Sequence, residues 1–398
     1  MSSDRPILIL SASAGAGHNV AAAALEREFR AQLRGAVVEV IDTLRHTNTF
    51  FRALYASGYL GLVNHAPTAM GWLYEATDKP ERSKRTSFRA GFQNLNAGGF
   101  VRYIRSRRPR LIVNTHFLPA EIVAHLRRRG RLDCPQVTVT TDFETHRLWA
   151  QAPTERYYTA TEEGRAYLAT WGVDPASIRV TGIPVRAEFA RTPPPRDELC
   201  RRLGIADDLP VVLVLCGGFG VGPTEQLLAE LARMPAAAQL VVVAGRNEAL
   251  RLRLERQAAT LERRTIRIVG FTDEMALWMR AADIVVTKPG GLTTAEALVC
   301  GLPLVIVNPI PGQESRNSDF LLEKGAAIKV NNLRLLGYRV NRLIEDEQRL
   351  GSLRAAAARL GRPHATEQIV ADAITVLNAA APVAPSAAVT LQEPIGTP

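Results

Sequence analysis

Cysteine is scarce in this sequence, and long hydrophobic segments are missing from it. The four cysteines among 398 residues lie far apart, without the CxxC spacing of a zinc site. So few cysteines argue against a disulfide scaffold and favour a reducing cytoplasm. No apolar run approaches the roughly 18 to 20 residues that a bilayer-spanning helix needs. The N-terminal run at 6–10 is too short for a signal peptide, and it predicts a first strand.

Two nucleotide-binding motifs are absent as well. The glycine-rich turn at 217–222 is not followed by Gly-Lys-Ser/Thr, which excludes a nucleotide-hydrolysing P-loop. No Asp-x-Asp occurs anywhere, so we expect no metal ion to assist at a diphosphate. The acidic cluster at 345–347 is more typical of a solvated helix face. We therefore expect neither a metal nor any other cofactor.

Acidic residues are outnumbered, and the imbalance lies in the first half of the chain. Residues 1–184 hold 24 Lys and Arg against 16 Asp and Glu, whereas the remainder of this chain, whose net charge is +10, is nearly balanced. A basic first half favours an anionic partner, which could be a membrane surface, nucleic acid or an acidic substrate. A general arginine bias that aids solubility is the alternative.

Strand and helix patterns alternate along the whole chain, which predicts an α/β protein with parallel sheets covered by helices. The length is too great for one ordinary core. We expect two Rossmann-like domains that face each other across a cleft. The predicted strands are 7–10, 37–41, 111–114, 137–141, 157–160, 211–216, 240–244, 266–269, 284–287, 304–307 and 327–330. The predicted divisions are a first domain at 1–186, a proline-rich linker at 187–198, a second domain at 199–380 and a disordered tail at 381–398.

The most informative stretch is 283–317. An apolar strand runs into Lys288-Pro289-Gly290-Gly291, a helix opens with Thr293 and Thr294, and a second strand delivers the polar loop at 312–317. Glycines at a helix N-terminus let backbone amides approach an anion, and the helix dipole adds positive potential. This pattern predicts a site for a phosphate-bearing ligand. The glycine turn at 217–222 could flank the same diphosphate.

A second glycine turn, at 11–17, follows the first strand and ends at His18. A dinucleotide fingerprint is one interpretation, with Asp42 as the ribose-binding acid, but Val20 is too bulky for the third glycine position. Histidine at this edge suits proton abstraction near neutral pH, while a capping or packing role is the alternative. Asp142 and His146 follow a later strand. Asp142 could hold or polarise His18, or cap the next helix.

Residues 50–103 differ from the rest because they hold 10 of the 24 aromatic residues, interleaved with basic ones. Phe51, Tyr55 and Tyr59 share one helical face. Aromatic and cationic amphipathic segments suit a bilayer interface. A helical insertion packed on the sheet is the alternative, and no nucleic-acid recognition motif is present, so we expect no nucleic-acid partner.

Seven blocks of this sequence resemble the monogalactosyldiacylglycerol synthase and processive diacylglycerol glucosyltransferase family, within glycosyltransferase family 28. The peptidoglycan lipid-intermediate N-acetylglucosaminyltransferase is a more distant resemblance. The blocks are SASAGAGH (11–18), TDFETHRLW (141–149), RYYTATEE (156–163), VTGIPVRAEF (180–189), CGGFGVG (216–222), the run at 269–303 and PIPGQESRN (309–317). The chain departs from the family in its thinner first glycine run and at Ser315-Arg316, which puts the identity of the sugar in doubt.

The resemblance implies a GT-B fold, with a UDP-sugar held by the second domain and a lipid acceptor approached by the first. His18 and Asp142 would be catalytic, with His18 near the acceptor hydroxyl. The implied donor-binding residues are Gly218, Phe271 (to uracil through its backbone), Lys288, Gly290, Gly291, Thr293, Thr294, Glu296 (to ribose), Gln313 and Glu314 (to the sugar), and Asn317. The implied membrane and acceptor residues are Phe51, Tyr55, Tyr59, Trp72, Arg82 and Arg85.

The function that the resemblance implies is metal-free, inverting transfer of glucose or galactose from a UDP-sugar to diacylglycerol or a related glycolipid. The implied location is the cytoplasmic face of the cell membrane, as a peripheral protein on an anionic surface. Two alternatives stay open: a UDP-sugar epimerase on the same fold, and a non-catalytic membrane-associated UDP-sugar sensor.

Overall fold

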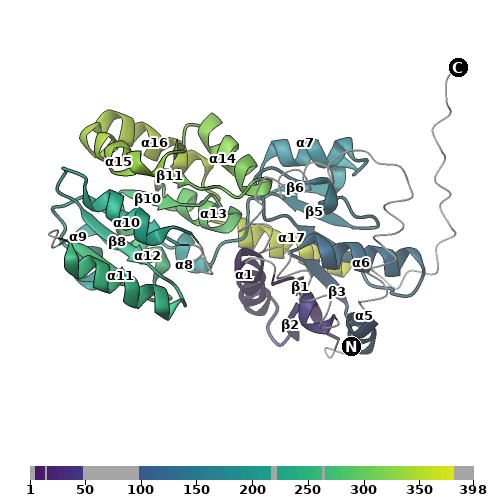
Figure 1. Ribbon diagram of the computed structural model, residues 1–398. Coiled ribbons are helices and arrows are strands. Elements are labelled where there is room, and N and C mark those ends of the chain that lie inside the picture. Colours follow the sequence, from purple (N-terminus) through teal and green to yellow (C-terminus); the bar gives the residue numbers. More distant parts are fainter. Residues whose placement is uncertain (1–4, 14–15, 48–97, 217–221, 262–264, 381–398) are drawn as a thin grey trace, which may run out of the picture.

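Two parallel β-sheets, each flanked by helices, lie side by side in an elongated molecule (Figure 1). The computed structural model describes residues 5–13, 16–47, 98–216, 222–261 and 265–380. The α/β class and the two parallel sheets that we expected are confirmed. Residues 50–97 of the aromatic segment at 50–103 and the tail at 381–398 lie outside the described residues.

The first sheet has the strand order β2-β1-β3-β4-β5-β6. Its strands are β1 (Ile7–Ser11), β2 (Val38–Asp42), β3 (Leu111–Asn114), β4 (Gln136–Val139), β5 (Arg156–Thr159) and β6 (Ile178–Val180). Its helices are α1 (Ala16–Gln32), η1 (Thr43–His46), α5 (Gly98–Arg107), α6 (Phe117–Arg128), η2 (Arg147–Trp149), α7 (Glu162–Thr170) and η3 (Pro175–Ser177). The short strand β6 was not among the strands that we predicted.

The second sheet has the strand order β12-β11-β10-β7-β8-β9. Its strands are β7 (Val211–Leu215), β8 (Gln239–Val243), β9 (Ile266–Val269), β10 (Ile284–Thr287), β11 (Leu304–Val307) and β12 (Ala327–Val330). Its helices are α8 (Ala187–Ala190), α9 (Arg196–Leu203), α10 (Thr224–Ala232), α11 (Glu248–Thr260), α12 (Met275–Ala281), α13 (Gly291–Val299), α14 (Gln313–Glu323), η4 (Leu333–Leu335), α15 (Leu336–Glu345) and α16 (Glu347–Leu360).

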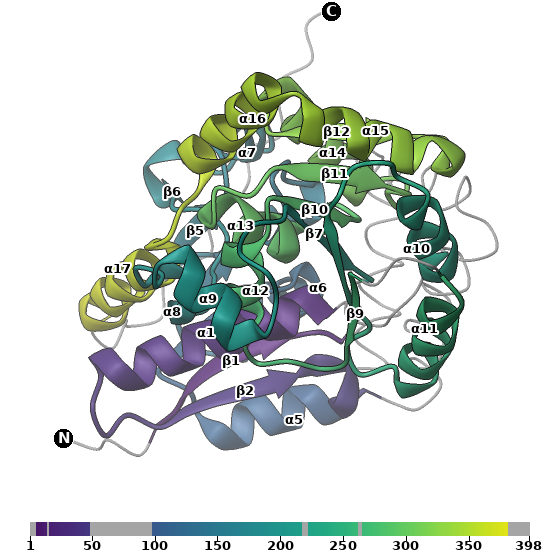
Figure 2. The same ribbon diagram turned by 90° about the vertical axis from the view of Figure 1, so that its left-hand side faces the viewer.

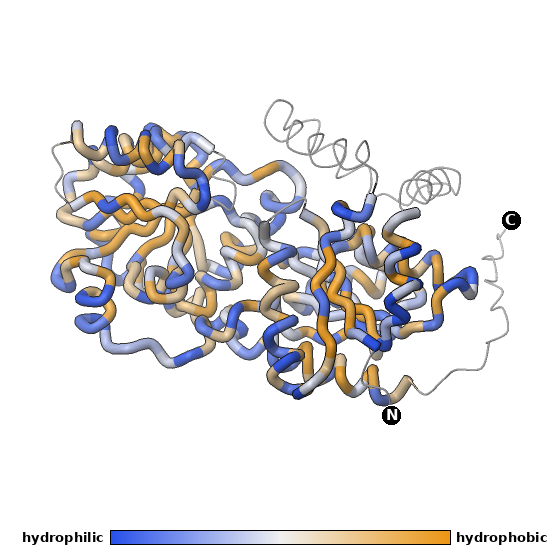
Figure 3. Tube along the Cα trace, turned by 90° about the horizontal axis from the view of Figure 1, so that it is seen from below, coloured by the Kyte–Doolittle hydropathy of each residue, from blue (hydrophilic) through white to orange (hydrophobic). Residues whose placement is uncertain are grey.

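Continuous apolar runs form the central strands because helices cover both faces of a parallel sheet. The four residues of β10 are all buried, as are the five of β1 and the five of β7. Figure 3 shows the apolar residues concentrated in the strands of both sheets. Polar residues that end these strands therefore lie together at the carboxyl edge of each sheet. In the first sheet, Ser11 at the end of β1 pairs in register with Asp42 at the end of β2.

The C-terminal helix α17 (Ala365–Ala379) returns to the first domain, although we had assigned residues up to 380 to the second. It lies beside α1 in both perpendicular views (Figure 1, Figure 2). Ile369, Val370 and Ala373 are buried in the core of the first sheet. Tyr158 on β5 donates a hydrogen bond of 2.9 Å to the Asp372 carboxylate. The last described helix is thus part of the first domain's packing. Among the described helices, none has the length and apolar character needed to cross a bilayer.

Candidate active site

The N-termini of helices α1 and α13 meet where the two domains touch. A Cβ atom on Gly17, near the start of α1, would lie 3.5 Å from the Cβ of Leu292 in α13. A Cβ on Gly291, the first residue of α13, would collide with the carbonyl oxygen of Thr141. Because a helix N-terminus carries partial positive charge, this convergence favours a negatively charged ligand at the junction.

His18, in the first turn of α1, is held by two threonines. Its Nδ1 lies 3.0 Å from the carbonyl oxygen of Thr115 and 2.9 Å from the hydroxyl of Thr141. A carbonyl oxygen can only accept a hydrogen bond, so this contact assigns the ring proton to Nδ1. The lone pair then lies on Nε2, which can act as a base.

The surroundings of His18 keep its imidazole neutral. Burial lowers the pKa of His18 to about 4, and the hydrogen bond with Thr115 opposes that shift. The ring of His116 stands edge-on to that of His18, with 4.6 Å between centroids. His116 accepts a hydrogen bond of 3.0 Å from the backbone N–H of Leu118, which caps α6. Burial lowers the pKa of His116 well below its usual value, and repulsion from His18 acts in the same direction.

The hydrogen-bond partner of Asp142 is Trp149, which neither of our two interpretations of this residue named. Its Oδ2 accepts a hydrogen bond of 3.2 Å from the indole N–H of Trp149, while the Nδ1 partners of His18 are Thr115 and Thr141. The carboxyl is almost fully buried, and burial raises its pKa to about 7, against the effects of Trp149 and Arg316. Asp142 thus lies one residue from a partner of His18 without bonding to its Nδ1. His146 accepts from the N–H of Leu148 and caps η2.

Sequence reasoning missed Thr115, Thr141, His116 and Trp149 as neighbours of the site. A usable signal exists, because Thr115 and His116 directly follow the buried strand β3. Polar residues in that position lie at the carboxyl edge of a parallel sheet, next to those that follow β1 and β4.

In the second domain, Lys288 lies between two glycine-rich turns. A Cβ on Gly222 would lie 3.6 Å from the Cε of Lys288. Gly290, which precedes α13, would place a Cβ 3.8 Å from the Oε1 of Glu314. The end of the 217–222 turn and the Lys288 loop therefore come together as expected for a shared anion site. Gly218 itself lies outside the described residues.

Glu314 and Gln313 open helix α14 at the same edge. Glu314 accepts a hydrogen bond of 2.7 Å from the backbone N–H of Ile310, which ties the polar loop to the helix. Burial raises the pKa of Glu314, while Ile310 and the charge of Lys288 lower it.

Of the remaining predicted donor residues on α13 and α14, two are fully buried. Thr294 is fully buried, and its hydroxyl has no hydrogen-bond partner within the described part of the chain, whereas Thr293 is half-buried. Asn317 is also fully buried, and its amide bonds to the backbone of both domains, at Phe143 and Pro289.

Glu296 lies on α13, whereas Phe271 follows β9 at the edge of the second sheet. Glu296 is buried, with its Oε1 3.9 Å from the Nε of Arg186. Burial raises the pKa of Glu296 to about 7, Arg186 lowers it and Glu188 raises it. The ring of Phe271 is half exposed, and the guanidinium of Arg246 lies 3.7 Å from its centroid, which is a cation–π contact.

The predicted membrane residues Phe51, Tyr55, Tyr59, Trp72, Arg82 and Arg85 lie outside the described residues. A surface hollow of about 610 Å³ lies on the second domain, between α10 and α15, and contains none of the predicted site residues. Its lining residues are Gln226, Glu230, Arg233, Arg334, Gly337 and Tyr338.

A comparison with solved structures identifies the architecture. The crystal structure of Acinetobacter baumannii MurG superposes with a TM-score of 0.59 at 16% identity, over 93% of this chain and 99% of that one. At this identity the likeness concerns the fold, which is the GT-B fold of two facing Rossmann-like domains. The molecule therefore has the architecture of GT-B proteins.

Sequence comparisons give the family. The model described as monogalactosyldiacylglycerol (MGDG) synthase matches residues 18–185, and the glycosyltransferase family 28 C-terminal domain matches 211–369. A probable monogalactosyldiacylglycerol synthase 2, chloroplastic, of Oryza sativa subsp. indica is 31% identical over 92% of this chain and 79% of its own length. A processive diacylglycerol beta-glucosyltransferase of Bacillus licheniformis is 29% identical over 94% of this chain and 96% of its own length. The chain belongs to this family and is a glycosyltransferase.

Proposed function

We propose that this enzyme transfers a hexose, glucose or galactose, from a UDP-sugar to the hydroxyl of diacylglycerol or a related glycolipid, with inversion at the anomeric carbon. The observation that carries the proposal is the position of His18. Its neutral imidazole lies at the junction where α1 and α13 converge, and α13 directly follows the Lys288 loop. The proposed base and the proposed anion site thus lie on opposite sides of one junction, and the enzyme names of both relatives agree with this pairing.

In the proposed reaction, the lipid oxygen attacks the anomeric carbon as the bond to the diphosphate oxygen breaks. UDP leaves with the bonding electrons, and the hydroxyl proton passes to Nε2 of His18. The Nδ1–H stays on the Thr115 carbonyl, which supports this tautomer. A positioned base of this kind typically contributes on the order of 100- to 10,000-fold in rate. Partial exposure of His18 leaves the acceptor a way to reach it.

The second domain would hold the donor. Lys288 and the amides at the start of α13 would offset the charge that develops on the departing diphosphate, a role that preorganised donors fill without a metal. Glu296 would bind the ribose hydroxyls, and its pKa of about 7 lets the carboxyl accept or donate hydrogen bonds there. Gln313 and Glu314 would contact the sugar hydroxyls, and the backbone at Phe271 would pair with uracil. No metal or cofactor is part of the proposal.

We place the reaction at an anionic membrane surface on the cytoplasmic side, because a diacylglycerol acceptor resides in a bilayer. The excess of basic residues in the first domain supports this location. The aromatic residues Phe51, Tyr55, Tyr59 and Trp72, with Arg82 and Arg85, would form the contact.

The test offers UDP-glucose and UDP-galactose separately to the full chain with diacylglycerol vesicles, with and without anionic lipid, and identifies the products by mass. We expect hexosyl-diacylglycerol and one UDP per sugar transferred. The His18→Ala variant should lose turnover by a factor on the order of 100 or more while still binding UDP.

Two outcomes would contradict the proposal. Isomerised sugar from UDP-sugar in the absence of lipid would identify an epimerase instead. Binding of UDP-sugar without product on any vesicle would favour a non-catalytic sensor.

A further inference from the structure

Asn317, in the first half of α14, bonds the two domains to each other through one side chain. Its Oδ1 accepts a hydrogen bond of 3.0 Å from the backbone N–H of Phe143, which belongs to the first domain. Its Nδ2 donates a hydrogen bond of 3.0 Å to the carbonyl oxygen of Pro289 in the second domain. The residue is fully buried. Both ends of the amide are therefore engaged by main chain rather than directed at solvent.

Each backbone partner of Asn317 belongs to one half of the candidate active site. Phe143 follows Thr141, whose hydroxyl contacts Nδ1 of His18, by two residues. Pro289 follows Lys288 and precedes Gly290, the cap of α13. One amide thus connects the loop beside the base to the loop of the anion site.

The Phe143 side of the bridge is held in place by its own contacts. The hydroxyl of Thr161 donates a hydrogen bond of 2.7 Å to the carbonyl oxygen of Phe143, so both backbone polar groups of this residue are bonded. The Phe143 ring stacks on Phe320 of α14, with 5.1 Å between centroids. The Thr161 bond fixes the Phe143 backbone within the first domain, and the ring stacking adds a second contact between the domains.

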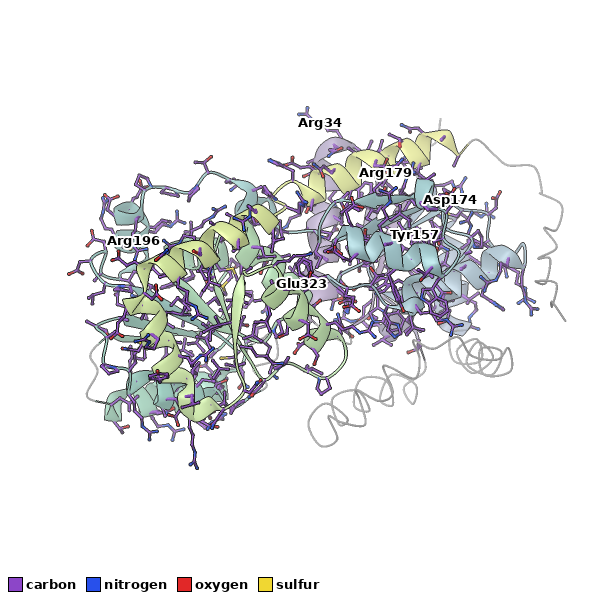
Figure 4. All side chains as sticks on the ribbon, turned by 90° about the horizontal axis from the view of Figure 1, so that it is seen from above. Arg34, Tyr157, Asp174, Arg179, Arg196 and Glu323 are labelled. Carbon is purple, nitrogen blue, oxygen red and sulfur yellow. The ribbon has the colours of Figure 1, made fainter. Side chains whose placement is uncertain are left out.

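Helix α14 carries further contacts to the first domain along its length. Arg316 forms an ion pair of 3.2 Å with Glu144, and Lys324, just past the helix end, forms one of 2.7 Å with Glu163. Figure 4 places Glu323, the last residue of α14, at the junction of the two domains. Asn317 is fully buried, whereas the two ion pairs in this row of contacts are more exposed.

We propose that Asn317 is an interdomain positioning residue, which sets the distance between the His18 base and the anion site of Lys288 and Gly290, rather than a direct contact to the sugar. The bridge requires an acceptor and a donor on one short planar group, which only asparagine supplies at this length. An aspartate would point an oxygen at the Pro289 carbonyl. The catalytic part of this inference rests on the proposed function, whereas the bridge between domains does not.

The experiment compares Asn317→Leu and Asn317→Asp with Ser318→Ala as the matched control. Ser318 is the next residue of α14, is equally buried, and its hydroxyl has no hydrogen-bond partner in the described part of the chain. Calorimetry gives the affinities for UDP and for UDP-glucose, X-ray scattering gives the radius of gyration, and single-turnover kinetics gives the rate of transfer. Thermal unfolding checks that each variant is folded. If Asn317→Leu does not fold, Asn317→Asp provides the test.

A positioning role predicts that the ratio of UDP-glucose to UDP affinity stays at the wild-type value while the radius of gyration increases. The transfer rate should fall on the order of 100-fold, as expected for a misplacement of about 1 Å between reacting groups. Ser318→Ala should match the wild type in all three measurements.

The inference is wrong if UDP-glucose affinity falls while UDP affinity and the radius of gyration do not change, because that pattern belongs to a sugar contact. If the wild type transfers no sugar to lipid, the proposed function fails. Scattering and the affinity ratio would still decide the role of Asn317.

Discussion

Burial determines the protonation states of the residues around the junction. It lowers the pKa of His18 to about 4 and raises those of Asp142 and Glu296 to about 7. Each shift favours the neutral form of its group, because a low-polarity environment disfavours charge of either sign. The base is thus uncharged at pH 7, and the two carboxyls can each carry a proton near neutrality.

Asp142 gives a prediction for stability against pH. Its pKa rises from 3.8 in the unfolded chain to about 7 in the folded one, so its contribution to stability is complete below pH 3.8 and is lost as pH rises toward 7. An amide at this position would still accept from Trp149 but would never ionise. The substitution Asp142→Asn should therefore raise the free energy of unfolding at pH 8 by roughly 2 to 4 kcal/mol, with little gain at pH 4.

Urea unfolding at the two pH values measures this difference. Asp133→Asn, at an exposed aspartate of the same domain, is the matched control and should show no comparable gain. An equal gain for Asp142→Asn at both pH values would mean that ionisation of this carboxyl is not the cause.

Residue types and spacing were enough to place His18 at the edge of the first sheet, because a glycine turn after a buried strand leads there in any parallel sheet. The partner of Asp142 was not accessible in the same way. Trp149 reaches Asp142 only because the chain between them folds back through η2, which brings together residues seven positions apart. Asn317 is a similar case, since its partner Phe143 is 174 positions away. Sequence patterns predict the elements, whereas such contacts depend on how the domains pack.

At the level of elements, α13 is the helix through which the second domain meets the first. Its strand–turn–helix pattern was predictable from Lys288 to Thr294. Its closeness to Thr141 was not, because no local pattern encodes an approach between domains. Gly291 permits that approach, since it has no Cβ to collide with the Thr141 carbonyl.

Gly291→Ala tests this approach. Alanine favours a helix over glycine by roughly 0.5 to 1 kcal/mol, so local propensity alone predicts a stabilised protein. The collision with backbone should outweigh this gain, with a net loss of about 1 to 3 kcal/mol, as for other overpacked sites. Transfer should also slow, because α13 would be pushed away from the backbone of Thr141, whose side chain contacts His18.

Gly351→Ala in α16 is the control, because a Cβ there would meet nothing within 4 Å. We expect it to be neutral or slightly stabilising in thermal unfolding and to leave transfer intact. If the two alanine variants have the same stability and transfer rate, the Thr141 carbonyl can move aside without loss of stability.

At the scale of the whole molecule, α17 follows the second domain in the sequence but packs against the first. The alternation of strands and helices predicted two domains in chain order, and this pattern has no means of indicating that a final amphipathic helix returns to the first sheet. The return is visible only in its partners: the α17 carboxylate Asp372 accepts from Tyr158 and pairs with Arg156 at 2.9 Å, both on β5. The first domain is therefore completed by a helix that follows the second domain in the sequence.

Ile369→Ala should accordingly destabilise the first domain and not the second. Ile369 is fully buried among residues of the first sheet, and removal of such a side chain typically costs about 2 to 5 kcal/mol. Two domains need not unfold together, so the measurement is amide hydrogen exchange resolved by segment. Exchange should accelerate in β1, β5 and α1, whereas β10 and β11 should keep the wild-type rates. UDP affinity should persist, because the proposed donor residues lie in the second domain.

Gln368→Ala, on the exposed side of the same helix, should change the exchange rates of neither domain. Faster exchange confined to β10 and β11 would instead show that α17 stabilises the second domain, to which its place in the sequence had assigned it.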